Sequence, residues 1–173
     1  CFNASTDREI LRALALADEF GLRMEIAGGD EAWRLTGTLK THGAPVYLTL
    51  NVPKEPEHKK DADPEPARLT EENERIRKEL VGCARLLHEK RVRFCFATVG
   101  LASAADALPN IAAMVQNGLP ADAALAALTT TPAALFGLDQ THGTIVKGKT
   151  ANLTVLNAPL GDKHAKVRYL IAD

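Results

Sequence analysis

The stretch that decides the fold is AALTTTPAALFGLDQTHGTIVKGKTANLTVLNAP, residues 126–159. Its first part reads as a helical turn. Pro132 favours the start of that turn, and Gly137 permits a left-handed exit from it. After Gly137 the apolar residues alternate with a period of two, and Gly148 allows a tight turn. The pattern therefore predicts that a helical region gives way to short strands near residue 138.

Upstream of this stretch, apolar runs rich in β formers alternate with segments of helical period. The expected strands cover residues 2–4, 22–26, 44–50 and 91–97, and the expected helices cover 7–20, 30–42, 70–88, 103–117 and 120–128. Strands that alternate with helices are typical of parallel β/α units. Four strands are too few to close an eight-stranded barrel.

We therefore predict an α/β fold with two parts. Residues 1–138 form a partial TIM-like (β/α) barrel, and residues 139–173 form a short β-sandwich tail. In the tail we expect two short strands on either side of Lys147-Gly148-Lys149 and a third over residues 167–173. A charged segment with four prolines, residues 52–69, reads as a loop.

Composition excludes several classes of function. The net charge of −1 and the 5% share of aromatic residues give no basis for binding nucleic acid through charge or stacking. No apolar stretch approaches the roughly 20 residues that a bilayer span needs. Cys95 lies in an apolar run and is expected to be a buried core thiol. The cytoplasm is the default compartment, but Cys1 stands where Met is expected, so we expect a fragment or processed product whose targeting segment would be missing.

Residues 126–159 resemble the C-terminal signature of the amidohydrolase superfamily, in particular its imidazolonepropionase-like branch. The family pattern reads roughly A-L-x-x-x-T-x-N-P-A-x-x-L-G-L, followed by G-x-I-x-x-G-K-x-A-D-L-V-V-L. The matching residues are Ala127-Leu128, Thr131-Pro132-Ala133, Phe136-Gly137-Leu138, Gly143-Thr144-Ile145, Gly148-Lys149, Ala151 and Leu153. The resemblance implies the C-terminal half of the barrel, and a tail that joins N-terminal strands in a composite sandwich. A flavodoxin-like sheet also fits four parallel strands, but it does not explain this tail.

The resemblance also implies zinc or another divalent metal, which acidifies a water molecule. The family's ligands are His on strands one, five and six, Lys or His on strand four, and Asp on strand eight. By order of elements, this chain would hold strands five to eight. Asn3 stands at the fifth-strand position, residues 25–29 contain no His, and Thr98 or Val99 stands where Asp is expected. A neutral amide is a poor zinc ligand and Val is none, so we predict no metal ligand in this chain.

The five histidines do not replace the missing ligands, because no two of them have i, i+4 helix spacing or H-x-H strand spacing. They are His42, His58, His88, His142 and His164.

Four residues are candidates to line the mouth of the barrel and bind substrate. Asn3, Gly28, Asn51 and Thr98 lie near the carboxyl ends of the expected strands, where barrels of this kind bind their ligands. The alternative, that they are ordinary strand-end residues, stays open, and no catalytic residue is assigned.

Two functions remain open. The chain is part of a protein that hydrolyses C–N bonds, for example in cyclic amides, or it is a non-catalytic relative that binds a small molecule or serves a structural role. The missing ligands favour no metal-dependent activity for this chain alone. A half barrel exposes sheet edges and apolar surface, so we expect a homo-oligomer or pairing with the missing N-terminal half.

Overall fold

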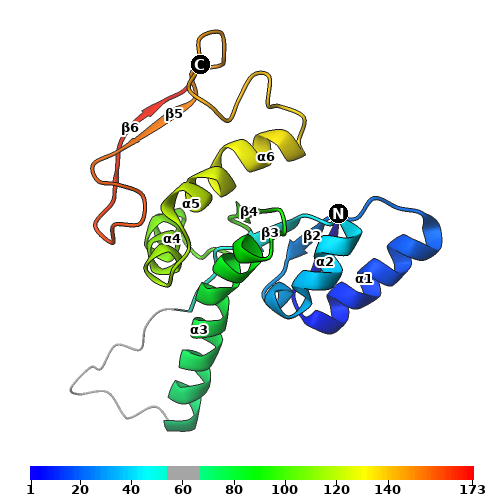
Figure 1. The fold of residues 1–173 in the computed structure, drawn as a ribbon. Coiled ribbons are helices and arrows are strands. Elements are labelled where there is room, and N and C mark those ends of the chain that lie inside the picture. Colours follow the sequence, from blue (N-terminus) through cyan, green and yellow to red (C-terminus); the bar gives the residue numbers. More distant parts are fainter. Residues whose placement is uncertain (54–66) are drawn as a thin grey trace.

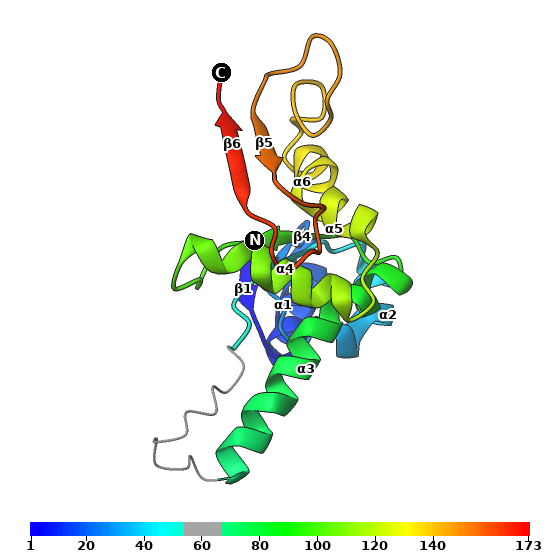
Figure 2. The same ribbon diagram turned by 90° about the vertical axis from the view of Figure 1, so that its left-hand side faces the viewer.

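The computed structural model describes residues 1–53 and 67–173 (Figures 1 and 2). Two sheets are present in this part of the chain, a parallel sheet of four strands and an antiparallel pair. The strands are β1 (Phe2–Ala4), β2 (Ile26–Gly28), β3 (Val46–Thr49), β4 (Phe94–Ala97), β5 (Leu153–Leu156) and β6 (Val167–Ile171). The helices are α1 (Asp7–Phe20), α2 (Thr36–His42), α3 (Ala67–Glu89), α4 (Ala107–Gln116), α5 (Ala121–Leu128) and α6 (Thr130–Leu135), with 3-10 turns η1 (Ala32–Leu35) and η2 (Ala104–Asp106).

The four-stranded sheet has the order β1-β2-β3-β4, and all of its pairs are parallel. Sequential strands are neighbours and a helical crossover follows each of the first three, as expected for β/α units. The predicted α/β fold with four parallel strands is confirmed.

One face of this sheet packs against the helices and forms the main core. Ile26, Val46 and Phe94 are register partners on this face, and all three belong to the core cluster. Helix residues that complete the core include Leu14 of α1 and Leu87 of α3. Because successive strand residues point to opposite faces, the residues between them face the side that would be the interior of a closed barrel.

The first helix shows how local sequence fixes an element. Thr6 is the N-cap, and its side chain accepts a hydrogen bond from the backbone N–H of Glu9. The Glu9 carboxylate in turn accepts hydrogen bonds from the backbone N–H groups of Ser5 and Thr6, which makes a capping box. The helix ends at Gly21, as predicted, in a left-handed conformation.

The second strand is shifted relative to its prediction. It covers Ile26–Gly28 and not residues 22–26. Leu22 lies on the surface with 52% of its area exposed, and strand pairing with β1 and β3 begins only at Ile26. Apolar character at Leu22 and Met24 suggested an early start, but neighbouring strands decided where the ladder forms.

The tail contains two strands where three were expected. β5 and β6 pair antiparallel, but residues 143–147 form no strand, so that prediction was wrong. Ile145 is 86% exposed, which indicates that this β-prone segment has no partner within the described residues. Lys149 of the signature has a structural role, because its Nζ donates hydrogen bonds to the carbonyl oxygens of Asp139 (2.6 Å) and His142 (3.1 Å).

Most of the predicted loop over residues 52–69 lies outside the described residues. The helix that follows begins at Ala67, three residues before the expected start. The domain boundary between residues 138 and 139 stays a prediction. Across residues 1–53 and 67–173, no helix is long and apolar enough to cross a membrane.

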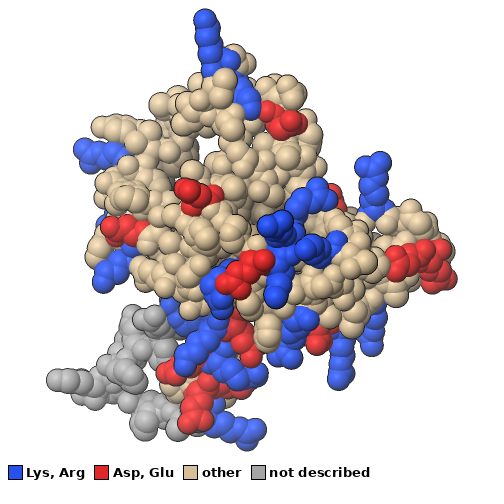
Figure 3. Space-filling model, in the orientation of Figure 1, with Lys and Arg blue, Asp and Glu red and all other residues tan. Residues whose placement is uncertain are grey.

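Charged side chains are unevenly distributed over the surface. On the face drawn in Figure 3, they gather over α3 and around α1 and α2, whereas the part built from α5, α6 and the tail is mostly uncharged. Exposed apolar side chains are frequent in that part. They include Leu125, Leu128, Phe136, Ile145, Val146, Tyr169 and Leu170.

Candidate functional site

The carboxyl ends of the four parallel strands meet at one edge of the sheet, and the four predicted mouth residues lie at this edge. Asn3 lies within β1, Gly28 is the last residue of β2, Asn51 follows β3, and Thr98 follows β4. Asn3, Asn51 and Thr98 are exposed, whereas Gly28 is buried. The parallel register, in which Ala4, Gly28, Leu48 and Phe96 are partners across the sheet, explains why these residues share one edge.

The loops after β1 and β2 are joined by backbone hydrogen bonds. The N–H of Gly29 donates to the carbonyl of Ala4 (2.9 Å), and the N–H of Glu31 donates to the carbonyl of Ser5 (2.9 Å). Gly28 and Gly29 have φ values of +104° and +65°, a region that residues with a side chain rarely adopt. This corner of the strand-end edge is therefore closely packed main chain.

A polar pair that the sequence did not reveal lies beside this corner. The hydroxyl of Thr49, at the end of β3, donates a 2.9 Å hydrogen bond to the carboxylate of Asp30, in the loop after β2. Both residues are half-buried. Their spacing of 19 residues carries no local signal, so only the parallel pairing of β2 with β3 brings them together.

Asn51 lines a pocket with a volume of about 730 Å³. This pocket lies at the carboxyl ends of β3 and β4, beside α4. Its lining residues include Val52, Pro53, Leu101, Asp106, Asn110 and Lys163. Asn3, Gly28 and Thr98 do not line it, so the structure brings the four predicted residues to one edge but not into this one cavity.

Asn110 is a second polar residue that the sequence analysis missed. Its side-chain amide donates a 2.7 Å hydrogen bond to the carbonyl of Leu50, which links α4 to the end of β3. Arg77 of α3 makes a similar link, because its Nη1 donates to the carbonyl of Pro53 at 2.7 Å. A polar residue among the apolar positions of the helix, as in Pro109-Asn110-Ile111, was the signal that could have identified the first link.

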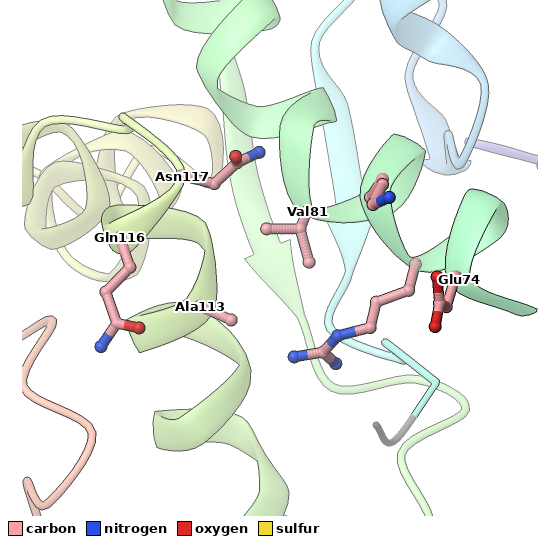
Figure 4. A pocket seen from close by; sticks show the side chains of 7 residues that line it. Glu74, Val81, Ala113, Gln116 and Asn117 are labelled. Atoms are coloured by element: carbon pink, nitrogen blue, oxygen red, sulfur yellow. The ribbon is translucent and has the colours of Figure 1, made fainter. Parts of the chain in front are cut away.

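Another pocket, of about 460 Å³, lies between α3 and α4 (Figure 4). Glu74 and Val81 of α3 lie opposite Ala113 and Gln116 of α4, and Asn117 follows α4. This groove is lined by helix side chains and by no residue of the strand ends, so we do not assign it to the mouth.

The face of the sheet opposite the main core carries Tyr47 and its register partner Cys95. Tyr47 is 9% exposed, and its ring stacks on Phe136 with centroids 5.8 Å apart. Its hydroxyl is buried and has no hydrogen-bond partner among the described residues. Burial, together with the nearby Glu25 carboxylate, raises the pKa of Tyr47 to about 12.

The thiol of Cys95 is also buried, as predicted from the sequence. Burial and the charge of Glu25 raise its pKa to about 11, so the thiol stays protonated at neutral pH. The Tyr47 hydroxyl and the Cys95 thiol are therefore both uncharged at neutral pH, and the ring of Phe136 stacks on Tyr47.

The residues at the strand ends do not fit a catalytic metal. Zinc in a hydrolase is held by about three protein ligands drawn from His, Asp, Glu and Cys. In the described residues, no group of three or more such side chains lies close enough to hold an ion. On the side of the sheet away from the main core, the register partner of Asn3 on β2 is Ala27, whose side chain has no metal-binding atom.

The amidohydrolase family profile matches residues 3–172, so this chain belongs to the amidohydrolase family. The family predicted from residues 126–159 is thereby confirmed. A comparison with curated protein sequences gives no match.

Three solved structures illustrate the similarity in fold. An amidohydrolase from Thermotoga maritima MSB8 has a TM-score of 0.75 and 22% identity over 98% of this chain and 40% of its own. A prolidase complexed with N-methylphosphonate-L-proline has a TM-score of 0.65 and 21% identity, with coverage of 98% and 42%. A Xaa-Pro dipeptidase with bound methionine in its active site has a TM-score of 0.61 and 21% identity, with coverage of 97% and 48%.

This chain therefore spans less than half the length of these proteins. The four parallel strands and their helices correspond to part of a TIM-like barrel, as predicted.

Proposed function

We propose that this chain forms part of the mouth of an amidohydrolase-type barrel and binds a small molecule there through hydrogen bonds, without supplying metal ligands. The observation that carries the proposal is the edge formed by the carboxyl ends of β1 to β4. Amide and hydroxyl groups of Asn3, Asn51 and Thr98 are exposed at this edge, and no metal-binding group is found there in the described residues.

The reaction class is proposed from the family. Amidohydrolases act on C–N bonds such as those of cyclic amides, and two of the similar structures are named as a prolidase and a Xaa-Pro dipeptidase. A metal-dependent reaction of this kind would need its ligands from residues other than those described here. The chain's own contribution would be to bind and orient the substrate through Asn3, Asn51, Thr98 and the backbone at Gly28.

The second candidate is a non-catalytic relative that binds a ligand or serves a structural role. The observation that favours it is the combination of Asn3 on β1, Ala27 on β2 and Thr98 after β4, none of which is a good metal ligand.

Elemental analysis of the purified full-length protein, together with a hydrolysis screen on amides and cyclic amides, distinguishes these candidates. Less than stoichiometric zinc and no turnover would favour the non-catalytic relative. One bound zinc per chain with turnover would favour the hydrolase, whose metal ligands would then come from residues outside this chain.

The role of the mouth residues has its own test. Asn3→Ala and Thr98→Val should weaken binding of any ligand found in the screen, since each removes hydrogen-bonding capacity. The matched control is Thr154→Val, on the exposed side of β5, which should leave binding unchanged. Equal affinity in all three variants would show that Asn3 and Thr98 are ordinary strand-end residues.

We also propose that the chain associates, as a homo-oligomer or with a polypeptide that supplies the N-terminal half of the barrel. In the described residues, β1 and β4 each have one edge without a strand partner, and unpaired edges favour pairing with another chain. Exposed apolar side chains such as Phe20 on α1 (64%) support this. Gel filtration with light scattering over a range of concentrations tests the proposal, and a monomer at every concentration would contradict it.

A further inference from the structure

The face of the parallel sheet away from the main core carries a carboxylate near the carboxyl ends of the strands. Side chains alternate along β3, so Thr49 points to the same face as Tyr47, whereas Leu48 between them lies in the core. Thr49 is the last residue of β3, two residues nearer the carboxyl end than Tyr47. Its 2.9 Å hydrogen bond to Asp30 therefore places this carboxylate over the same face, at the strand ends.

The carboxylate of Asp30 is oriented but not neutralised. The Thr49 hydroxyl donates to its Oδ1 atom, and both residues are half-buried. Within residues 1–53 and 67–173, Asp30 makes no ion pair, and its Oδ2 atom accepts no hydrogen bond. A half-buried carboxylate loses part of its hydration, so a cation that reaches it is favoured. One fixed carboxylate oxygen is thus open to a ligand.

The neighbours of this carboxylate on the same face neither cover it nor balance its charge. Ala97 is the register partner of Thr49, and Ala27 is that of Tyr47, so both strands beside β3 carry only a methyl group there. A second carboxylate acts on this face nearer its amino end. Burial and then the charge of Glu25 raise the pKa of Tyr47, and Glu25 makes no ion pair with a described residue. These two carboxylates make the face favourable for positive charge.

From this arrangement we infer that Asp30, oriented by Thr49, binds a cationic group of the ligand, such as an ammonium or a guanidinium. The inference rests on the proposed function, because it assumes that a small molecule binds at the strand-end edge, and it adds the charge of that molecule. An ammonium or guanidinium donates to Oδ2 while Thr49 keeps its bond to Oδ1. The alternative role of the pair, tying the loop after β2 to β3, predicts no dependence on ligand charge.

Three small probes test this charge preference in the full-length protein. They are the N-acetyl methylamides of lysine, norleucine and glutamate, which share an amide backbone and differ in side-chain charge. Affinity is measured by nuclear magnetic resonance titration at low and at high salt. We expect the lysine probe to bind roughly five- to tenfold more tightly than the norleucine probe at low salt, and the glutamate probe to bind most weakly. The preference for lysine should shrink at high salt, because ions screen a partly exposed pair.

Substitutions at the pair assign the preference to it. Asp30→Asn removes the charge but keeps an oxygen that accepts from Thr49, so the preference for lysine should disappear from a folded protein. Thr49→Val should reduce the preference, whereas Thr49→Ser keeps the hydroxyl and should retain it. Asp122→Asn is the matched control, because it removes one negative charge from an exposed position on α5. Thermal unfolding checks that each variant is folded, and the two Thr49 variants keep the test decisive if Asp30→Asn does not fold.

Several results would overturn the inference. They are equal binding of the lysine and norleucine probes, a preference for lysine that survives Asp30→Asn, an equal loss of preference in Asp122→Asn, and no binding of any probe. Binding of the norleucine probe that is weakened by Asn3→Ala but not by Asp30→Asn would overturn the inference and still support the proposed function. The two failures are therefore distinguishable.

Discussion

The four-stranded sheet and the two-stranded tail of this chain contrast in how much of each strand is buried. In β3, Val46, Tyr47 and Leu48 are all buried, and helices cover one side of the sheet. In β6, every residue from Val167 to Ile171 is exposed, although most of them are apolar. Figure 2 shows β6 on the outer side of β5, away from the helices.

The difference shows what positions a strand. The strands of the parallel sheet are fixed by the core they cover, so their register follows from burial. The tail strands have similar β propensity but little to pack against, and residues 143–147 therefore form no strand at all. β propensity describes how well a residue fits a half-buried pleated surface, and that surface must be supplied by neighbours.

The largest expected effect lies in the sheet. Leu48 is 1% exposed and belongs to the main core, so Leu48→Ala should lower the free energy of unfolding by about 2–5 kcal/mol, through lost burial and a cavity. Urea denaturation measures this. A loss below about 1 kcal/mol would show that β3 is not the centre of the core.

A change of opposite sign is expected on the other face of the same strand. Tyr47→Phe removes a buried hydroxyl without a hydrogen-bond partner and keeps the stack on Phe136, so it should leave stability unchanged or raise it by about 1 kcal/mol. Thermal unfolding compares it with the wild type. A loss of more than about 1 kcal/mol would show that the hydroxyl has a hydrogen-bond partner. The Glu25 carboxylate, which helps to raise the pKa of Tyr47, would be the candidate.

A loss smaller than that of Leu48→Ala is expected at the start of α1. Thr6→Ala removes the N-cap hydrogen bond to Glu9 and should cost about 1 kcal/mol, as measured by denaturant unfolding. Ser5→Ala is a suitable control because the Ser5 side chain is not the cap. Equal losses in the two variants would contradict the capping box.

The capping box also makes a pH-dependent contribution. Hydrogen bonds from the backbone of Thr6 and Ser5 hold the pKa of Glu9 below its ordinary value. Because the pKa is lower in the folded state, this contribution is complete above the ordinary Glu pKa and is lost as the pH falls through the folded value. Glu9→Gln should therefore flatten the stability profile of the chain at acid pH, and an unchanged profile would contradict it.

The smallest effect is expected in the tail. Leu170 is 75% exposed, so Leu170→Ala should change the free energy of unfolding by less than about 0.5 kcal/mol. If the loss approached that of Leu48→Ala, the tail would be covered by another chain in solution. Unfolding at two protein concentrations separates these cases, because stability gained by association rises with concentration.

Much of the fold was predictable from local patterns. The capping residues around α1, the helical turn between Pro132 and Gly137, and the order of strands and helices all follow from signals within a few residues. The start of β2 and the fate of residues 143–147 were not predictable in this way. Both depend on whether a neighbouring strand is present, and a single segment does not carry that information.

For the candidate site, too, some features were predictable from the sequence and others were not. The sequence alone determined the family, through the spacing of residues 126–159, and the absence of histidines from the expected strand ends. Only the tertiary structure decided that Thr49 binds Asp30, that Ser5 fills the space beside Gly28, and that Tyr47 lies under Phe136. The physical reason is that composition and periodicity encode the element a residue belongs to. Contacts between elements form only when the whole sheet is assembled, because they depend on register and on the path of loops far apart in the chain.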